Sequence, residues 1–225
     1  MSIIYLISPA QTEYAQSCYC FGRGNWILSE KGWSQAELTA TYLKKSLLDG
    51  ERFHIVSSPD RRCLSMAGLL SDLTDSMVKI SNEFLGIDLG DWKGKDEAAL
   101  RAGDGNRFEQ WLENADFPSP GGESLGDMSR RSWLELVSVA QLLEAGEHLA
   151  LFAPPEIIGT VTCSLLDAPQ TSIHKMRLSP AGIAILKKEQ NDQYQLHAWN
   201  LLVCQDDSLK SDPSGAVDLE LASVK

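Results

Sequence analysis

Short apolar runs alternate with segments of helical spacing along most of the chain. The runs are bounded by turn-forming residues and lie at 3–7, 53–56, 148–152, 183–186 and 196–203. Runs of this length indicate buried strands, and the amphipathic stretches between them indicate helices that cover a sheet. The pattern predicts an α/β fold.

Four helix starts follow from local chemistry. Each has a serine, whose hydroxyl can accept hydrogen bonds from free backbone amides, or a proline, which is tolerated in a first helical turn. The starts are Ser29, Ser58 with Pro59 in the first helical position, Ser124 with Asp127 at capping-box spacing, and Pro154 with Pro155. The second start places Arg62 in the first turn of its helix.

The pattern weakens between 85 and 122, where short helical pieces carry Trp92, Phe108, Trp111 and Phe117. We expect this stretch to form a small lid over one end of the sheet. Apolar periodicity is lost from 205 to 225, which predicts a flexible C-terminal tail. The predicted organisation is one domain over 1–204, with its lid at about 85–122, followed by the tail.

Composition narrows the possible roles. A chain of 225 residues with 43% hydrophobic content can bury one substantial core. The net charge of −11, without a basic stripe, argues against nucleic acid as a partner. No apolar stretch reaches membrane-spanning length, and residues 1–9 lack the basic start of a signal peptide, so we expect a cytoplasmic protein with no membrane partner.

The cysteines argue against a metal centre and against a disulfide framework. Their number is odd and their spacing is scattered, without a paired C-x-x-C motif. The five are Cys18, Cys20, Cys63, Cys163 and Cys204. We therefore expect no metal and no cofactor, and a reducing compartment.

Six short strings, in order along the chain, resemble motifs of the histidine phosphatase superfamily, also called the phosphoglycerate-mutase-like family. They are SPAQTE at 8–13, LSEKGWSQA at 28–36, SSPDRR at 57–62, LGIDLGDWKG at 85–94, PGGES at 120–124 and LALFAPP at 149–155. The resemblance covers roughly 2–203. The string CFGRGN at 20–25, with GDW at 90–92 and PGGES, is most similar to the alpha-ribazole phosphatases.

The resemblance implies a fold and a site. The fold is a three-layer α/β sandwich with a mostly parallel central sheet and helices on both faces. Aligning the strings places a vestigial phosphate pocket at Ser8, Pro9, Arg62, Gly86 and Pro154. Two further residues, Thr12 and Glu123, are expected at its rim.

At these positions the family's catalytic groups are replaced. Pro9 and Pro154 stand where the family has its two histidines, and a proline offers no ring nitrogen able to attack phosphorus. Ser8 replaces an arginine that binds phosphate with a bidentate fork. Gly86 replaces the proton-donating glutamate, a group worth roughly 10²–10⁴ in rate. Only Arg62 is retained, and phosphoryl transfer is predicted to be lost, leaving no catalytic residue of the family's kind.

The leading interpretation is a pseudophosphatase that binds a small molecule or a protein partner of unknown identity. Two alternatives stay open: an active phosphomonoesterase resembling alpha-ribazole phosphatase that uses non-standard residues, and a scaffold or homo-oligomer without a ligand. Arg62 is either an anion anchor or an ion-pair residue, with the second favoured. Glu123 is either a relic acid near the pocket or a carboxylate opposing a helix dipole.

Overall fold

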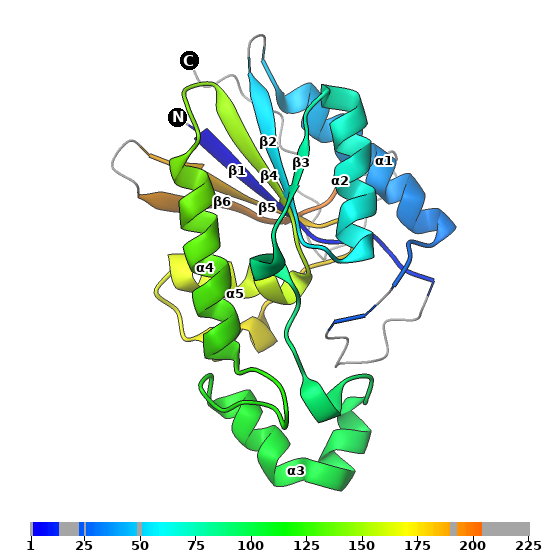
Figure 1. Ribbon diagram of the computed structural model, residues 1–225, viewed down its shortest axis with the longest axis vertical. Helices are drawn as coiled ribbons and strands as arrows, with labels where there is room; N and C mark the ends of the chain where they lie inside the picture. The colour runs from blue at the N-terminus through cyan, green and yellow to red at the C-terminus, as the bar shows by residue number, and fades with distance from the viewer. Residues whose placement is uncertain (1, 14–22, 25, 49–50, 190–192, 204–225) are drawn as a thin grey trace, which may run out of the picture.

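The computed structural model describes residues 2–13, 23–24, 26–48, 51–189 and 193–203. They build a mixed six-stranded sheet of order β3-β2-β4-β1-β5-β6 (Figure 1). The strands are β1 (Ser2–Ile7), β2 (Arg52–Ser57), β3 (Val78–Ile80), β4 (Glu147–Phe152), β5 (Ile183–Lys188) and β6 (Tyr194–Leu201). β3, β2, β4 and β1 pair in parallel, whereas β5 is antiparallel to both β1 and β6.

Helices cover both faces of this sheet (Figure 1). One face packs against α1 (Glu30–Ser46) and α2 (Arg61–Thr74), the other against α4 (Leu125–Gln141) and α5 (Pro155–Leu165). Because side chains alternate along a strand, β1 sends Leu6 to the core beneath α4 and α5 and Ile7 to the core beneath α1 and α2. The predicted three-layer α/β sandwich is confirmed.

Three of the predicted helix starts are found in the structure. The Ser29 hydroxyl accepts a hydrogen bond from the Gly32 amide at 3.0 Å at the start of α1. Ser124 and Asp127 form a complete capping box at the start of α4. Pro154 precedes α5, whose first residue is Pro155.

The remaining start, that of α2 (Arg61–Thr74), is wrong by two residues. Asp60, not Ser58, caps α2, and its carboxylate accepts from the Arg62 amide at 2.9 Å. Pro59 lies ahead of the helix instead of inside it, and the Ser58 hydroxyl accepts from the Asp60 amide at 3.3 Å. Aspartate is one of the strongest N-cap residues, so it competes successfully with the serine two positions earlier.

The 85–122 segment carries one short 3-10 helix and one long helix. Ahead of it lies the 3-10 helix η1 (Asn82–Phe84), and within it lie η2 (Gly90–Trp92) and α3 (Glu97–Glu113), which is kinked at Asp104. Trp92 packs edge-on against Phe108 and Trp111, and its indole donates to Asp104 at 3.1 Å. These aromatics supply a core for the segment, and Figure 1 shows α3 at the far end of the molecule from β1.

The remaining elements complete the frame. A 3-10 helix, η3 (Gln170–Lys175), follows α5 and leads toward β5. The described thiols, Cys63 and Cys163, are both buried, while Cys18, Cys20 and Cys204 lie outside the described residues, as does the expected tail at 205–225. Over the parts of the chain that the structure describes, none of the helices is long and apolar enough to cross a membrane.

Candidate functional site

The carboxyl ends of β1, β2 and β4 meet at one edge of the sheet because these strands are parallel. Backbone hydrogen bonds continue past the strand ends: the Ala153 amide donates to the Ile7 carbonyl at 3.1 Å, and the Ser58 amide donates to the Phe152 carbonyl at 2.9 Å. This edge therefore gathers the residues that follow each strand, which is where an open α/β sheet usually places its ligand site.

A cavity of about 250 Å³ opens at this edge. Four predicted residues line it: Ser8, Pro9, Thr12 and Arg62. The rest of the lining is formed by Ala10, Gln11, Pro155, Arg177, Leu178, Ser179 and Pro180. The loop before β5 thus contributes much of the wall, which the motif strings gave no reason to expect.

Arg62, the retained arginine, already holds an anion. Its Nε donates to Asp60 Oδ1 at 2.9 Å and its Nη2 donates to Asp60 Oδ2 at 2.5 Å, so the guanidinium fork is bound to a carboxylate two residues away. Arg62 is only 8% exposed. Burial alone would lower the pKa of Arg62, but the hydrogen bond and charge of Asp60 outweigh it and raise this pKa. The favoured ion-pair interpretation matches this geometry.

Ser8 and Pro9 end β1 without any group suited to attack phosphorus. Ser8 is 3% exposed, and its amide donates to the Gly182 carbonyl at 2.9 Å. The Pro9 carbonyl accepts from the Ala181 amide at 3.0 Å. Both residues are therefore fixed through their backbones to the loop before β5, with the Pro9 ring and the Ser8 side chain on the cavity wall.

Gly86 and Pro154 stand close to each other but do not line this cavity. A Cβ atom built on Gly86 would lie 3.7 Å from Pro154 Cγ and only 2.5 Å from Glu156 Oε1. The carboxyl group of Glu156 takes up the room beside Gly86. Burial raises the pKa of Glu156, against the lowering effects of its own backbone amide and of the Arg62 charge.

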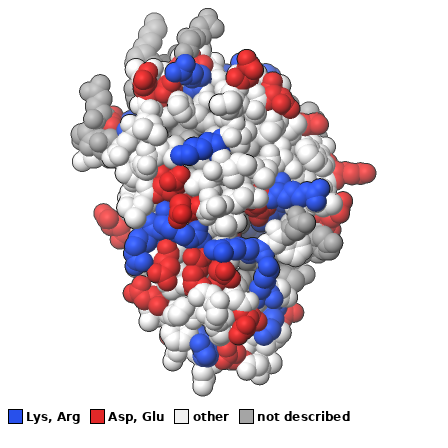
Figure 2. Space-filling model, viewed as in Figure 1, with Lys and Arg blue, Asp and Glu red and all other residues white. Residues whose placement is uncertain are grey.

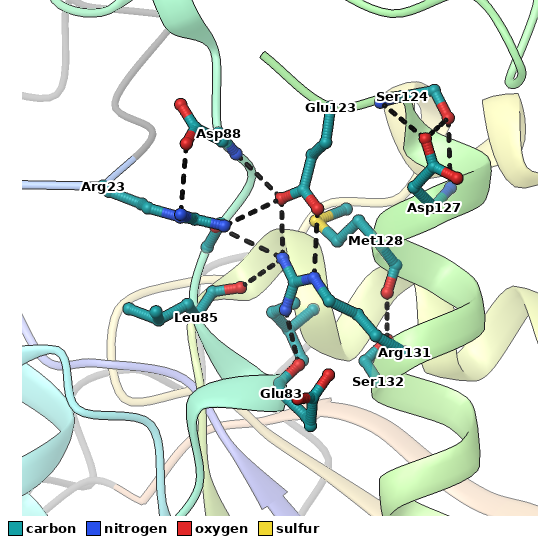
Figure 3. A network of polar contacts seen from close by, with 12 residues as sticks. Arg23, Glu83, Leu85, Asp88, Glu123, Ser124, Asp127, Met128, Arg131 and Ser132 are labelled. Carbon is teal, nitrogen blue, oxygen red and sulfur yellow. Dashed lines mark hydrogen bonds and ion pairs between the residues drawn. The ribbon is translucent and has the colours of Figure 1, made fainter.

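Glu123 is also not on the cavity wall, because it belongs to a polar network (Figure 3). It accepts from Arg131 Nη2 at 2.7 Å and Nε at 3.1 Å, from the Asp88 amide at 2.8 Å, and from Arg23 Nη2 at 3.3 Å. Arg131 also donates to the Leu85 carbonyl at 2.8 Å. The network joins α4 to the backbone on either side of Gly86. Glu123, which we expected at the rim of the pocket, holds these two segments together instead.

Arg177 is a second positively charged residue on the cavity wall. It is exposed, and within the described ranges no carboxylate is paired with it. Its carbonyl accepts from the Trp199 indole at 2.9 Å, which fixes its backbone to β6. On the face shown in Figure 2 acidic and basic side chains are interspersed. Among the described residues no three His, Cys, Asp or Glu side chains gather in a group able to hold a metal ion.

Three site residues were missed by the sequence reasoning. Asp60 had a signal, because an aspartate two positions ahead of an arginine at a helix start can cap the helix and pair with the arginine at once. Arg177 and Glu156 had none, since each meets its neighbours across a long sequence separation. Glu156 lies 70 positions from Gly86, which it contacts only through the tertiary fold.

Comparison with known proteins agrees with this architecture. A sequence model of the histidine phosphatase superfamily (branch 1) matches residues 4–202. Glucosyl-3-phosphoglycerate phosphatase of Mycolicibacterium vanbaalenii is 31% identical over 173 residues, 74% of this chain and 75% of that protein. A bifunctional protein of Mycobacterium tuberculosis is 31% identical over 128 residues, but the chain spans only 34% of that relative's length.

Solved structures give the same picture. The native structure of a mycobacterial glucosyl-3-phosphoglycerate phosphatase superposes with a TM-score of 0.73 at 27% identity, covering 89% of this chain and 99% of that one. A candidate alpha-ribazole-5′-P phosphatase of Escherichia coli has a TM-score of 0.73 at 19% identity, covering 91% of this chain and 100% of that one. At that lower identity the likeness is one of fold.

Proposed function

We propose, from the premise that this chain belongs to the histidine phosphatase superfamily, that it has lost phosphoryl transfer and binds a small molecule in the cavity beside Ser8. The observation that carries this proposal is the bidentate contact between Arg62 and Asp60. An arginine that binds phosphate must present its fork to the ligand. Here Nε and one Nη2 hydrogen are taken by a carboxylate of the same helix turn, so only the end of the guanidinium is left to face the cavity.

Displacing Asp60 would be costly for a phosphate group. Each hydrogen bond to a charged group contributes on the order of 1.5–3 kcal/mol. Asp60 is tethered to Arg62 through the chain, so an incoming phosphate would compete with a partner that loses no translational freedom. It would also bring negative charge toward the Asp60 carboxylate. The inner end of the old pocket is therefore unfavourable for a phosphate dianion.

The side chains at the other centre positions support the same conclusion. Pro9 and Pro154 provide neither a nucleophile nor a hydrogen-bond donor, and Ser8 has no neighbouring base among the described residues that line the cavity. A serine without a base is a weak nucleophile. Covalent catalysis of the family's kind has no starting group here.

The open cavity favours a small anionic ligand that carries hydroxyl groups. Hydroxyls from Ser8, Thr12 and Ser179 are near its wall, and Arg177 supplies a positive charge on the same wall. A volume of about 250 Å³ suits a ligand of modest size. Relatives named glucosyl-3-phosphoglycerate phosphatase point to a similar chemical character, an acidic sugar derivative.

Two assays test the proposal. Hydrolysis of p-nitrophenyl phosphate and 3-phosphoglycerate is measured for the wild type, Arg62→Ala and Arg177→Ala, and we expect turnover indistinguishable from the buffer rate for all three. Robust turnover that Arg62→Ala abolishes would overturn the proposal in favour of an active phosphomonoesterase.

Binding is tested separately by calorimetry with glycerate and 3-phosphoglycerate. We expect saturable binding by the wild type that Arg177→Ala weakens about tenfold, the effect of losing roughly 1.4 kcal/mol. Arg61→Ala is the matched control, because Arg61 is an exposed arginine outside the cavity lining. If neither acid binds and the solution mass exceeds that of one chain, the scaffold interpretation replaces this one.

A further inference from the structure

A side chain at position 86 and the present carboxyl of Glu156 would occupy the same space. The Glu156 carboxyl oxygen lies 2.5 Å from where a Cβ of residue 86 would stand. Cβ atoms are not found that close to other heavy atoms, so any side chain at position 86 requires the Glu156 carboxyl to shift from its present place. Because Gly86 has no side chain, it leaves the space that the Glu156 carboxyl occupies.

We propose that the pocket has kept one carboxyl group by exchange between these positions, with Glu156 as its proton-carrying side chain and Gly86 as the space that holds it. The inference concerns the side of the vestigial phosphate pocket at Gly86 and Pro154, which is separate from the cavity wall of the proposed function, and it does not require phosphatase activity to be lost. It assigns to Glu156 a chemical role that the replacements at Ser8, Pro9 and Pro154 leave intact.

The surroundings of Glu156 suit a proton carrier. The charged groups that face it are Asp60 and Arg62 from the start of α2, and the Cys63 thiol lies in the same helix turn. Arg62 is committed to Asp60, so the pair presents little net charge to Glu156. Burial then dominates and raises the pKa of the Glu156 carboxyl above its ordinary value.

A purely structural role for Glu156 predicts something different. Glu156 is in the first turn of α5, where a carboxylate that only opposes the helix dipole stays near solvent and has a lowered pKa. In this structure the carboxyl is turned toward Gly86 and Pro154, and its pKa shifts upward. The carboxyl also accepts hydrogen bonds from its own backbone amide and from that of Ile87, which lower the pKa, but burial outweighs them. A role confined to the helix end does not account for this upward shift.

The exchange is tested by the thermal stability of four variants. Gly86→Ala is made in the wild type and in Glu156→Ala, and we expect it to lower Tm by roughly 3–8 °C in the first background and to have no effect or a slight gain in the second. The control is Gly68→Ala, because a Cβ at Gly68 in α2 meets nothing within 4 Å. That substitution should change Tm equally in both backgrounds.

Titration of Glu156 gives a second measurement. It still detects displacement of the carboxyl in Gly86→Ala if that displacement hardly changes Tm. The ¹³C carboxyl signal is assigned by difference against Glu156→Gln and followed from pH 3 to 9. We expect it to titrate above the ordinary glutamate range in the wild type and to fall back into that range in Gly86→Ala. Background-independent Tm changes together with an unmoved titration would overturn the proposal, whatever the phosphatase assays show.

Discussion

The cavity at the carboxyl edge of the sheet and the Glu123 network near Gly86 have kept their motifs to very different degrees. Around the cavity, Ser8, Pro9 and Pro154 have lost the groups of the related enzymes, whereas the string PGGES is intact. The difference follows from what the side chains hold. Glu123 accepts hydrogen bonds from two arginines and a backbone amide. Ser8 and Pro9 line the cavity and are held through their backbones, so replacing their side chains leaves few partners unsatisfied.

The largest effect on stability is expected from Glu123→Ala, which tests the contrast between the network and the cavity. The substitution leaves Arg131 and Arg23 without their carboxylate in a partly buried setting, and we expect a loss of about 2–4 kcal/mol in the free energy of unfolding. Urea denaturation measures it. Ser8→Ala is the control on the cavity side and should change stability by less than about 0.5 kcal/mol. Equal losses for the two variants would contradict the contrast drawn between the regions.

Restoring the cavity groups tests whether the chemistry was lost only there. The variant combines Ser8→Arg, Pro9→His and Pro154→His with Asp60→Asn, which keeps the helix cap while freeing Arg62. Gly86 is retained. We expect hydrolysis of glycerol phosphate to appear, as the histidine nitrogen bonds to phosphorus, the P–O ester bond breaks and the Glu156 proton passes to the leaving oxygen.

Glu156→Gln in that background is expected to slow glycerol phosphate hydrolysis by about 100-fold. It should have much less effect on p-nitrophenyl phosphate, whose leaving group needs no proton. Hydrolysis that appears only after Gly86→Glu is added would show that Glu156 cannot serve as the acid. An inactive variant with an intact circular dichroism spectrum would show that the pocket has been remodelled beyond the centre positions.

A third region, at the opposite edge of the sheet, holds a buried carboxylate, Glu147, whose charged partners are exposed. Glu147 begins β4 and accepts from the Glu144 amide at 2.9 Å, from Arg52 Nε at 2.6 Å and from His54 at 2.8 Å. The backbone hydrogen bond from Glu144, with the contacts from Arg52 and His54, lowers its pKa from 4.5 to about 2. This carboxylate therefore stabilises the fold above pH 4.5, and the contribution is lost as the pH falls toward 2.

Glu147→Gln should lower stability by about 1–3 kcal/mol at pH 7 and flatten the loss of stability between pH 4.5 and 2. Melting curves at a series of pH values for both proteins measure the difference. An identical acid profile for the two would show that Glu147 is ionised no more readily in the folded chain than in the unfolded one.

The smallest effect on phosphate chemistry is expected from Asp60→Asn alone. Asparagine caps a helix about as well as aspartate, but it leaves the buried Arg62 guanidinium without its carboxylate, so we expect a loss of about 1.5–3 kcal/mol in the free energy of unfolding. Releasing the charge on Arg62 should strengthen the binding of inorganic phosphate by about tenfold, close to 1.4 kcal/mol. Calorimetry with phosphate measures it, with Asp60→Asn/Arg62→Ala as the control. Unchanged phosphate binding would mean that Asp60 is not what keeps the anion out.

Much of the fold could be predicted because its elements are long and strongly patterned. Five strands of the sheet coincide with apolar runs, and α1, α4 and α5 begin where their capping chemistry predicts. The short strand β3 was missed because its three residues, Val78, Lys79 and Ile80, are partly or largely exposed and carry no apolar run. The error at α2 arose because two capping residues compete within one turn.

The sequence by itself determined which chemical groups the pocket lacks, since a proline or a glycine lacks the same atoms in any fold. It also determined the alternation of strands and helices, because periodicity and capping are local properties, whereas the three-layer sandwich was implied by the resemblance to the family. Only the tertiary structure decided that the Glu156 carboxyl lies beside Gly86, because those two residues are 70 positions apart and meet only when the sheet is assembled. The contacts of Arg62 with Asp60 and of Arg131 with Glu123 join residues two and eight positions apart, so for them the fold decided the burial of the pair and not its proximity.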